Sequence, residues 1–461
     1  MTDAAPPPVT DPSWGGHIRA TIRLGLPLVG SQLAFIGLGV TDTIMLGWYG
    51  VSELAAGVLG TQLVFIMLIT GAGPANAVSA IVANALGQGD ERSVRRSVRM
   101  ALWAAAIYSV FALPILWQTE VIFLALGQEP ELAKLAQDYV RIALWSVPVA
   151  VAFNAIRSYL TALELGGILL WTNLAGLTLN FLANYMLIFG NWGAPELGIR
   201  GAAVATVLSN IVMLTVATTW ALTRPDLRKY QLFVRFFQPD WSALSEVFRL
   251  GWPISLTLLA EVSLFSISAV MMGWLGTVTL AAHGIAMQII SVLFMIPLGL
   301  AFAATVRVGR AVGRRDRQGL FRASVVVSSL ALALGIVFMT VLLVIPETLI
   351  NLFLDADNPD RPAIIAVGIP LLAVAALFQI VDTCQVIMAS MLRGLKDMRV
   401  PMIMAVFSYL GVGIGSAYVF GFTLGFGGVG VWTGLAAGLT LAAILMGARY
   451  VQLIKTAIQP G

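Results

Sequence analysis

The chain has 461 residues, of which 59% are hydrophobic and only 11% are charged. Soluble domains contain about 25% charged residues, and no soluble core could bury this much apolar surface. The composition therefore excludes a soluble protein and indicates an integral membrane protein. The formal net charge of +4 could indicate a nucleic-acid partner, but the basic residues lie at the ends of apolar segments, as is typical of membrane proteins. We therefore expect membrane lipids, and no nucleic acid, as partners.

Twelve apolar segments are long enough to cross a bilayer, which requires about 20 residues at about 1.5 Å per residue in a helix. In chain order the predicted spans are residues 18–47, 54–86, 99–125, 139–162, 170–190, 200–223, 248–275, 279–309, 323–353, 363–392, 401–422 and 429–453. Residues 1–17 lack the features of a cleavable signal peptide, so we expect the first span to be retained.

Basic loops alternate with acidic or neutral loops along the chain. The basic groups follow spans 2, 6, 8 and 10 and comprise Arg92, Arg95, Arg96, Arg99, Arg224, Arg228, Lys229, Arg235, Arg307, Arg310, Arg314, Arg315, Arg317, Arg393, Lys396 and Arg399. By the positive-inside rule both termini of this multi-pass membrane protein are predicted to be cytoplasmic.

The two halves of the sequence match at a fixed offset of 226 residues, the separation of Gly25 from Gly251. Shared lipid-facing composition could match apolar residues, but not Pro, Trp, Gln and Asp at one offset, so we infer a duplication. The matched pairs include Pro27 with Pro253, Trp48 with Trp274, Gln62 with Gln288 and Asp90 with Asp316.

The duplication predicts an all-α membrane protein of twelve transmembrane helices in two six-helix bundles. Six spans per half give both halves the same orientation, so their pseudo-twofold axis runs along the membrane normal. The N-lobe is predicted at 18–223 and the C-lobe at 248–453, with cytoplasmic tails at 1–17 and 454–461 and a cytoplasmic linker at 224–247. The spacing of Trp241, Leu244, Val247 and Phe248 predicts a short interfacial helix at the end of the linker.

Among the carboxylates inside the predicted span limits, three are candidate site residues: Asp42 in span 1, Glu261 in span 7 and Asp382 in span 10. Burying an ionised carboxylate costs several kcal/mol or more, so such a group faces water, takes up a proton or pairs with a cation. A permanently protonated structural carboxyl is the plainer interpretation, but Asn or Gln would serve that purpose without an ionisation penalty. Glu261 and Asp382 are predicted at similar depth in the C-lobe, and Asp42 nearer the outer side of the N-lobe.

Span 5 carries Asn180 and Asn184, which lie four residues apart and therefore on one helix face. Asn184 is predicted nearer the outer side, where it could meet Asp42; helix packing through the amides is the alternative. At the 226-residue offset Asp42 corresponds to Ser268, and Glu261 to Phe35. Neither carboxylate is copied in the other half, which indicates that the two lobes have different roles.

Motifs for other chemistries are absent from the sequence. There is no Gly-Lys dipeptide, hence no Walker A loop, and no HExxH or GxSxG pattern. Only two histidines are present, which argues against a metal-dependent or nucleophilic membrane enzyme. We therefore expect no cofactor, no enzymatic activity, and transport driven by an ion gradient.

Several motifs, in chain order, are similar to those of a known transporter family. They are Gly25-Leu-Pro-Leu, Thr41-Asp42-Thr43-Ile-Met-Leu-Gly, Leu54-Ala-Ala, Leu179-Asn180, Asn184-Tyr185, Gly198-Ile-Arg-Gly201 and Leu392-Arg393-Gly394. On these residues, over nearly its whole length, the chain resembles the multidrug and toxic compound extrusion (MATE) family. Glu261 and Asp382 resemble that family's NorM branch.

The resemblance implies secondary active export of amphipathic organic cations by alternating access, as a monomer. It implies that Asp42, Glu261 and Asp382 couple export to H⁺ or Na⁺, with Na⁺ a candidate ligand of Glu261 and Asp382, and that Asn180 and Asn184 support Asp42. A lipid-linked oligosaccharide flippase of the wider superfamily is the alternative, but it should hold pyrophosphate with several Arg or Lys residues, whereas the predicted cavity is acidic. A passive channel is disfavoured because duplicated lobes suit rocking around a central site.

Overall fold

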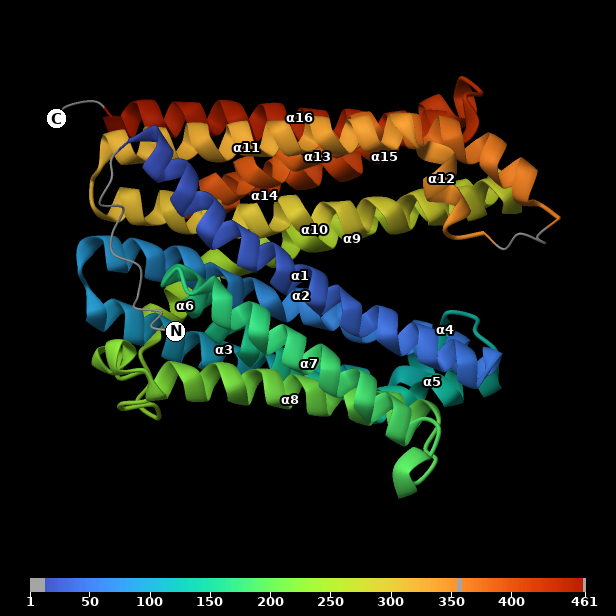
Figure 1. Ribbon diagram of the computed structural model, residues 1–461, viewed down its shortest axis with the longest axis horizontal. Coiled ribbons are helices and arrows are strands. Elements are labelled where there is room, and N and C mark those ends of the chain that lie inside the picture. Colours follow the sequence, from blue (N-terminus) through green and yellow to red (C-terminus); the bar gives the residue numbers. More distant parts are fainter. Residues whose placement is uncertain (1–12, 355–358, 459–461) are drawn as a thin grey trace. The chain divides into compact units, whose positions relative to one another are not determined.

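The computed structural model describes residues 13–354 and 359–458, and every regular element among them is a helix. The long helices are α1 (Trp14–Tyr49), α2 (Val51–Gln88), α3 (Glu91–Trp117), α7 (Gly166–Leu187), α8 (Ile199–Thr223), α9 (Trp241–Trp274), α10 (Thr277–Gly313), α11 (Arg317–Val344), α13 (Arg361–Gly394) and α16 (Gly427–Ile458) (Figure 1). The shorter helices are α4 (Thr119–Ala125), α5 (Pro130–Ala143), α6 (Ser146–Ala162), α12 (Pro346–Asn351), α14 (Arg399–Val406) and α15 (Ile414–Tyr418).

The described residues contain eleven helical segments long and apolar enough to span a membrane, or twelve if α5 and α6 count as one bent span. This confirms the predicted all-α membrane fold. α5 and α6, which between them cover the span predicted at 139–162, meet at an angle of 46°. The hydropathy pattern does not show this break, because apolar residues continue through it.

The span from Arg399 to Thr423 is not a regular α-helix. Two π-helical segments, η3 (Phe407–Gly413) and η4 (Val419–Thr423), interrupt it on either side of α15. It packs closely on α16, where a β-carbon at Gly434 would come within 2.1 Å of the Ala417 backbone nitrogen. Glycines let transmembrane backbones approach this closely, and π-helical turns are frequent at functional sites.

The chain divides into two compact units, and both divisions fall inside a helix. Unit 1 contains Gly30–Ser255, and unit 2 contains Leu256 onward together with the described residues up to Val29. The first part of α1 therefore belongs with the C-terminal half of the chain, and the first part of α9 with the N-terminal half.

Close backbone packing explains this exchange of helix segments. In unit 2 a β-carbon at Gly299 of α10 would lie 2.6 Å from the Val29 backbone nitrogen of α1. In unit 1 Gly73 of α2 packs against Ser255 of α9, whose hydroxyl donates to the Thr70 carbonyl at 2.6 Å. The residues of one pair lie 226 positions from those of the other, so the packing repeats with the sequence.

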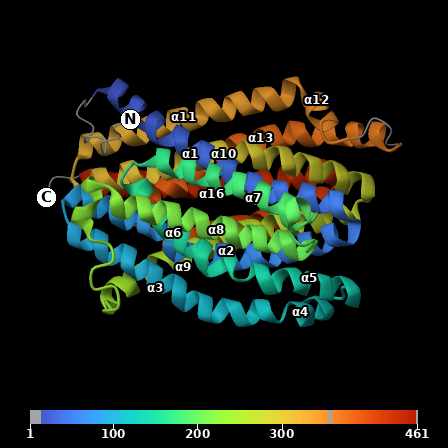
Figure 2. The same cartoon turned by 60° about the horizontal axis from the view of Figure 1, so that its bottom comes forward.

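Within unit 1, α7 and α8 run side by side, as both views show (Figures 1 and 2), and α2 packs against α3 and α6. Within unit 2, α13 packs against α10, α11 and α16. Figure 2 shows α12 at the C-terminal end of α11, before the chain continues into α13. These contacts place the polar residues of α7, α8 and α13 among their neighbouring helices.

Aspartate caps explain one of the repeated sequence positions. The Asp90 side chain accepts a hydrogen bond from the Ser93 backbone N–H at 3.0 Å at the start of α3. Asp316 accepts from the Gly319 N–H at 2.8 Å at the start of α11. Both carboxylates satisfy an N–H group that has no partner within the helix.

Helix limits differ from the predicted domain limits at the tails and the linker. α1 begins at Trp14, inside the predicted tail, and α16 continues to Ile458. α9 begins at Trp241, so the predicted interfacial helix is wrong: Trp241 to Phe248 form the first turns of the spanning helix. Hydropathy detects only the part of a helix in hydrocarbon, whereas these helices extend beyond it. Residues 1–12 and 459–461 of the predicted tails lie outside the described residues.

Candidate functional site

Asp42 lies in the part of α1 that belongs to unit 1, and its carboxylate accepts three hydrogen bonds. The amides of Asn180 and Asn184 on α7 donate to Oδ1 at 3.0 and 2.6 Å. The Thr206 hydroxyl on α8 donates to Oδ2 at 2.8 Å. The structure thus brings together Asp42 and both predicted amides, and it adds Thr206, which the sequence analysis missed.

This centre is built by the spacing of polar residues on α7. Asn180 and Asn184 are one helical turn apart, so both amides face α1. Both are fully buried, and Asp42 is 9% exposed. Three neutral donors stabilise the ionised form of a carboxylate without cancelling its charge. When Asp42 is ionised, its charge is therefore open to neutralisation by a proton or another cation.

Two further polar groups border the Asp42 centre. Tyr139 of α5 is buried, accepts a hydrogen bond from the Thr61 hydroxyl at 3.1 Å, and lies within electrostatic range of Asp42. The side-chain amide oxygen of Asn184, Oδ1, is buried and has no partner among the described residues. An unpaired buried acceptor next to a carboxylate is an available ligand for a cation.

Glu261 on α9 and Asp382 on α13 both lie in unit 2 and interact electrostatically. Asp382 is 4% exposed, and Glu261 is half-buried. Among the described residues, none forms a hydrogen bond to either carboxyl group. This differs from Asp42, whose two carboxylate oxygens both accept hydrogen bonds.

Unpartnered polar atoms lie on α13, which carries Asp382, and on the π-helical segment η3. Both amide atoms of Gln379 and the hydroxyls of Thr383, Ser408 and Tyr409 are buried and have no partner within the described part of the chain. Gln379, three residues before Asp382, shares its face of α13, and Tyr409 in the π-helical segment η3 lies within electrostatic range of Glu261 and Asp382. Buried polar groups are normally paired, and each unpaired one costs about 1–3 kcal/mol. These oxygens fit a cation or an ordered polar ligand.

Arg393, at the end of α13, interacts electrostatically with Glu261. Its position after span 10 indicated only that this end of the span is cytoplasmic. No sequence pattern linked it to Glu261 and Asp382. A fixed positive charge near two carboxylates reduces the net negative charge of the centre.

The donor set limits the metals that could bind. No group of three or more His, Cys, Asp or Glu side chains converges anywhere in the described residues. A transition-metal centre needs such a cluster. Two carboxylates with amide and hydroxyl oxygens suit a hard monovalent cation such as Na⁺, or a proton.

Comparison with known proteins identifies the family. The MatE family model matches residues 27–186 and 253–419. The probable multidrug resistance protein NorM of Rhizobium meliloti is 47% identical over 97% of this chain and 96% of its own length. Its namesake in Agrobacterium fabrum is 44% identical over 96% and 95%. These matches confirm the resemblance to the NorM branch.

Solved structures give the same fold. A multidrug resistance MATE family transporter in an outward-facing conformation superposes with a TM-score of 0.88 at 22% identity, covering 100% of both chains. A MATE structure in the bent conformation gives a TM-score of 0.86 over 96% of this chain and 97% of that chain. Because the family model matches more than half of the sequence and both NorM relatives span nearly all of it, the chain belongs to the MatE family of membrane transporters.

Proposed function

We propose that the chain exports amphipathic organic cations from the cell in exchange for H⁺ or Na⁺, by alternating access. Its relatives are named as probable multidrug resistance proteins, which supports small organic molecules as substrates. The observation that carries the proposal is the pair of buried acidic centres, one in each unit. A member of a transporter family is not an enzyme, and the chemistry of these centres is cation exchange.

The two centres have different environments and therefore different tasks. Glu261 and Asp382 lack hydrogen-bond donors within the described residues and lie near unpaired oxygens, which supports direct binding of the coupling cation or of the substrate's positive charge. Asp42 is held by Asn180, Asn184 and Thr206. Cation binding at Asp42 would weaken these bonds and loosen the contact of α1 with α7 and α8.

Competition for the carboxylates would couple the two fluxes. A carboxylate that holds the substrate cation loses its charge when it binds H⁺ or Na⁺, so the substrate leaves on the side where the ion enters. When the ion dissociates on the other side, the negative charge returns. Linkage makes the effect reciprocal, so substrate binding also expels the ion.

The expected setting is the bacterial inner membrane, with both termini cytoplasmic and a monomeric protein. The basic loops support this orientation through the positive-inside rule. The acidic character of both centres argues against a lipid-linked oligosaccharide as substrate, since pyrophosphate requires clustered Arg or Lys side chains.

The proposal is tested by the accumulation of a fluorescent organic cation in cells that do or do not express the protein, in media with and without sodium. Expression should lower dye accumulation. Dissipating the ion gradient should abolish the difference in accumulation between expressing and non-expressing cells. A difference that needs sodium identifies Na⁺ as the coupling ion, and one that persists without sodium but needs a pH gradient identifies H⁺. Equal accumulation in expressing and non-expressing cells would refute the proposal.

A further inference from the structure

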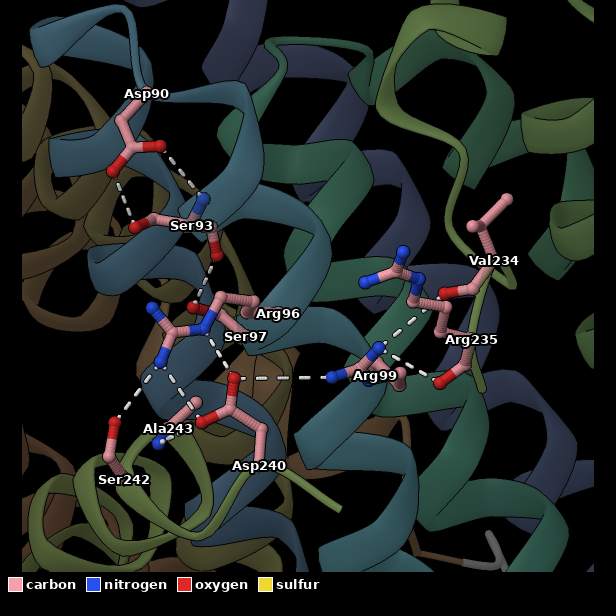
Figure 3. Close-up of polar contacts among 10 residues, drawn as sticks. All are labelled: Asp90, Ser93, Arg96, Ser97, Arg99, Val234, Arg235, Asp240, Ser242 and Ala243. Carbon is pink, nitrogen blue, oxygen red and sulfur yellow. Dashed lines mark hydrogen bonds and ion pairs between the residues drawn. The ribbon is translucent and has the colours of Figure 1, made fainter. Parts of the chain in front are cut away.

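The segment between α8 and α9 is held rigidly against α3 by side chains that bind its backbone. Arg99 donates to the Val234 and Arg235 carbonyls at 3.4 and 2.9 Å (Figure 3). The Trp103 indole donates to the Phe236 carbonyl at 3.0 Å. Three consecutive carbonyls are thus satisfied without a helix or strand, so the structure of this segment depends on α3.

An ion pair fixes the far end of the same segment. Arg96 forms a two-pronged contact with Asp240, whose Oδ1 also accepts from the Ala243 N–H at 3.2 Å (Figure 3). Arg96 donates further to the Ser242 hydroxyl at 3.1 Å. α3 therefore holds the segment and the first turn of the membrane-spanning helix α9 together.

These contacts use backbone groups and leave large apolar side chains exposed. Phe237 is 86% exposed, Trp241 68%, Val234 46% and Phe233 38%. Arg235, which has a positive φ of 56°, also presents an exposed side chain. We call residues 233–241 the linker surface. Aromatic residues this exposed are unfavourable in water, so a partner must cover them.

The composition and position of the linker surface indicate that partner. It leads directly into Trp241, the first residue of a spanning helix whose first turns extend beyond the hydrocarbon, so it lies on the headgroup side of the bilayer. On the other side of the linker, at the end of α8, Arg224 stacks on Trp220 with its guanidinium 4.9 Å from the ring. Aromatic rings and Arg side chains together are typical of the membrane–water interface.

Charge points to anionic lipid. Residues 224–240 contain four basic and two acidic side chains. Asp240 is paired with Arg96 and Lys229 with Glu91, so the net charge of the other charged groups is positive. We propose that the linker surface inserts Phe233, Phe237 and Trp241 into the headgroup region of the adjacent leaflet, with Arg235 bound to anionic lipid phosphates. This anchors unit 1 to the bilayer at the point where the chain passes into α9.

Site-directed labelling tests this directly on the full-length protein. Cys384 is the only cysteine, so a Cys384→Ser background accepts one label at a chosen site. Phe237→Cys and Phe233→Cys report on the linker surface, and Asp226→Cys is the matched control on an exposed, polar part of the same linker. Each variant carries a bimane fluorophore in nanodiscs of phosphatidylcholine, alone or mixed equally with phosphatidylglycerol. Lipids spin-labelled near the headgroup and aqueous iodide are the two quenchers.

We expect spin-labelled lipid to quench the labels at 237 and 233 several-fold more strongly than the label at 226, and iodide to show the reverse order. Phosphatidylglycerol should increase the quenching by spin-labelled lipid, and Arg235→Gln should remove that increase. Iodide quenching at 237 equal to that at 226 would overturn the proposal, because the surface would then be in water. Protection from both quenchers would also overturn it, because another protein or a second copy would then cover the surface. Neither result depends on transport, so the test is independent of the proposed function.

Discussion

Asp240→Asn isolates the electrostatic part of the contact between α3 and the start of α9. Asn remains a good helix N-cap, so the hydrogen bond to Ala243 can persist while the charge is lost. In the native protein the hydrogen bond from the Arg96 guanidinium lowers the pKa of the Asp240 carboxyl to about 2. The substitution removes this charge-assisted interaction and should loosen the segment from Gln231 to Ala243.

The size of the effect follows from that pKa. Lowering a carboxyl pKa from 3.8 to about 2 corresponds to about 2 kcal/mol, at 1.36 kcal/mol for each pKa unit. The Arg96 side chain is 35% exposed, and solvent screening reduces the net value to about 1–2 kcal/mol. Local opening of the segment should therefore become about 5- to 30-fold more frequent in Asp240→Asn.

Hydrogen–deuterium exchange of the purified protein measures this opening. At pH 7 amide protection over residues 231–243 should fall by that factor. The folded-state pKa of Asp240 lies below its unfolded value, so the stabilisation is present above about pH 4 and disappears as the pH falls toward 2. Native protection should decline across this window after correction for intrinsic exchange rates, whereas Asp240→Asn should show little change.

The matched control is Asp316→Asn, which alters the equivalent capping aspartate at the start of α11, in unit 2. It should affect exchange near Asp316 and leave residues 231–243 unchanged. Unaltered protection of residues 231–243 in Asp240→Asn, or a pH profile identical to that of the native protein, would refute the electrostatic account of this contact.

Other predictions concern the acidic centres. Glu261→Gln and Asp382→Asn should each abolish dye export at native expression levels, because the amide keeps the shape but loses the exchangeable charge. The exposed control Glu347→Gln should export normally. Near-normal efflux by both site variants would show that Glu261 and Asp382 have only structural roles. Thr206→Val should lower export about 10-fold or more through loss of a hydrogen bond to a charged group, worth about 1.5–3 kcal/mol, and Thr206→Ser should restore it. In detergent, affinity for a permanently charged dye should fall as sodium rises or pH drops, and Asp42→Asn should change this dependence; dye binding insensitive to both ions would exclude competition.

The spans were predictable because a bilayer requires long apolar segments: α1 contains its predicted span, and α9 contains all but the last residue of its own. Their starts were not, because helix formation continues past the hydrocarbon: α9 begins at Trp241, where the sequence indicated a separate helix. The bend between α5 and α6 and the two π-helical segments depend on packing against neighbours. No periodicity in the sequence predicts this bend or these π-helical segments.

The site was predictable where spacing fixes geometry. Asn180 and Asn184 lie one turn apart, so both meet the same carboxylate. Thr206 was missed because a threonine within a span commonly bonds its own helix, as Thr206 also does with the Ala202 carbonyl at 3.1 Å.

The surroundings of Asp382 were only partly accessible to sequence analysis. Gln379 lies three residues before Asp382, so its place on the same face of α13 could have been predicted from helical periodicity. The proximity of Tyr409 could not, because it depends on how the π-helical segment packs.

The central claim is that a cation gradient drives export through the buried carboxylates. Proteoliposomes containing purified protein test it most directly, with a fluorescent organic cation inside and an imposed sodium or proton gradient directed inward. Dye efflux should start only when one of the two gradients is applied, should be accompanied by entry of that ion, and should be absent with Glu261→Gln/Asp382→Asn. Equal dye efflux without any gradient, or undiminished gradient-driven efflux by the double variant, would contradict the account.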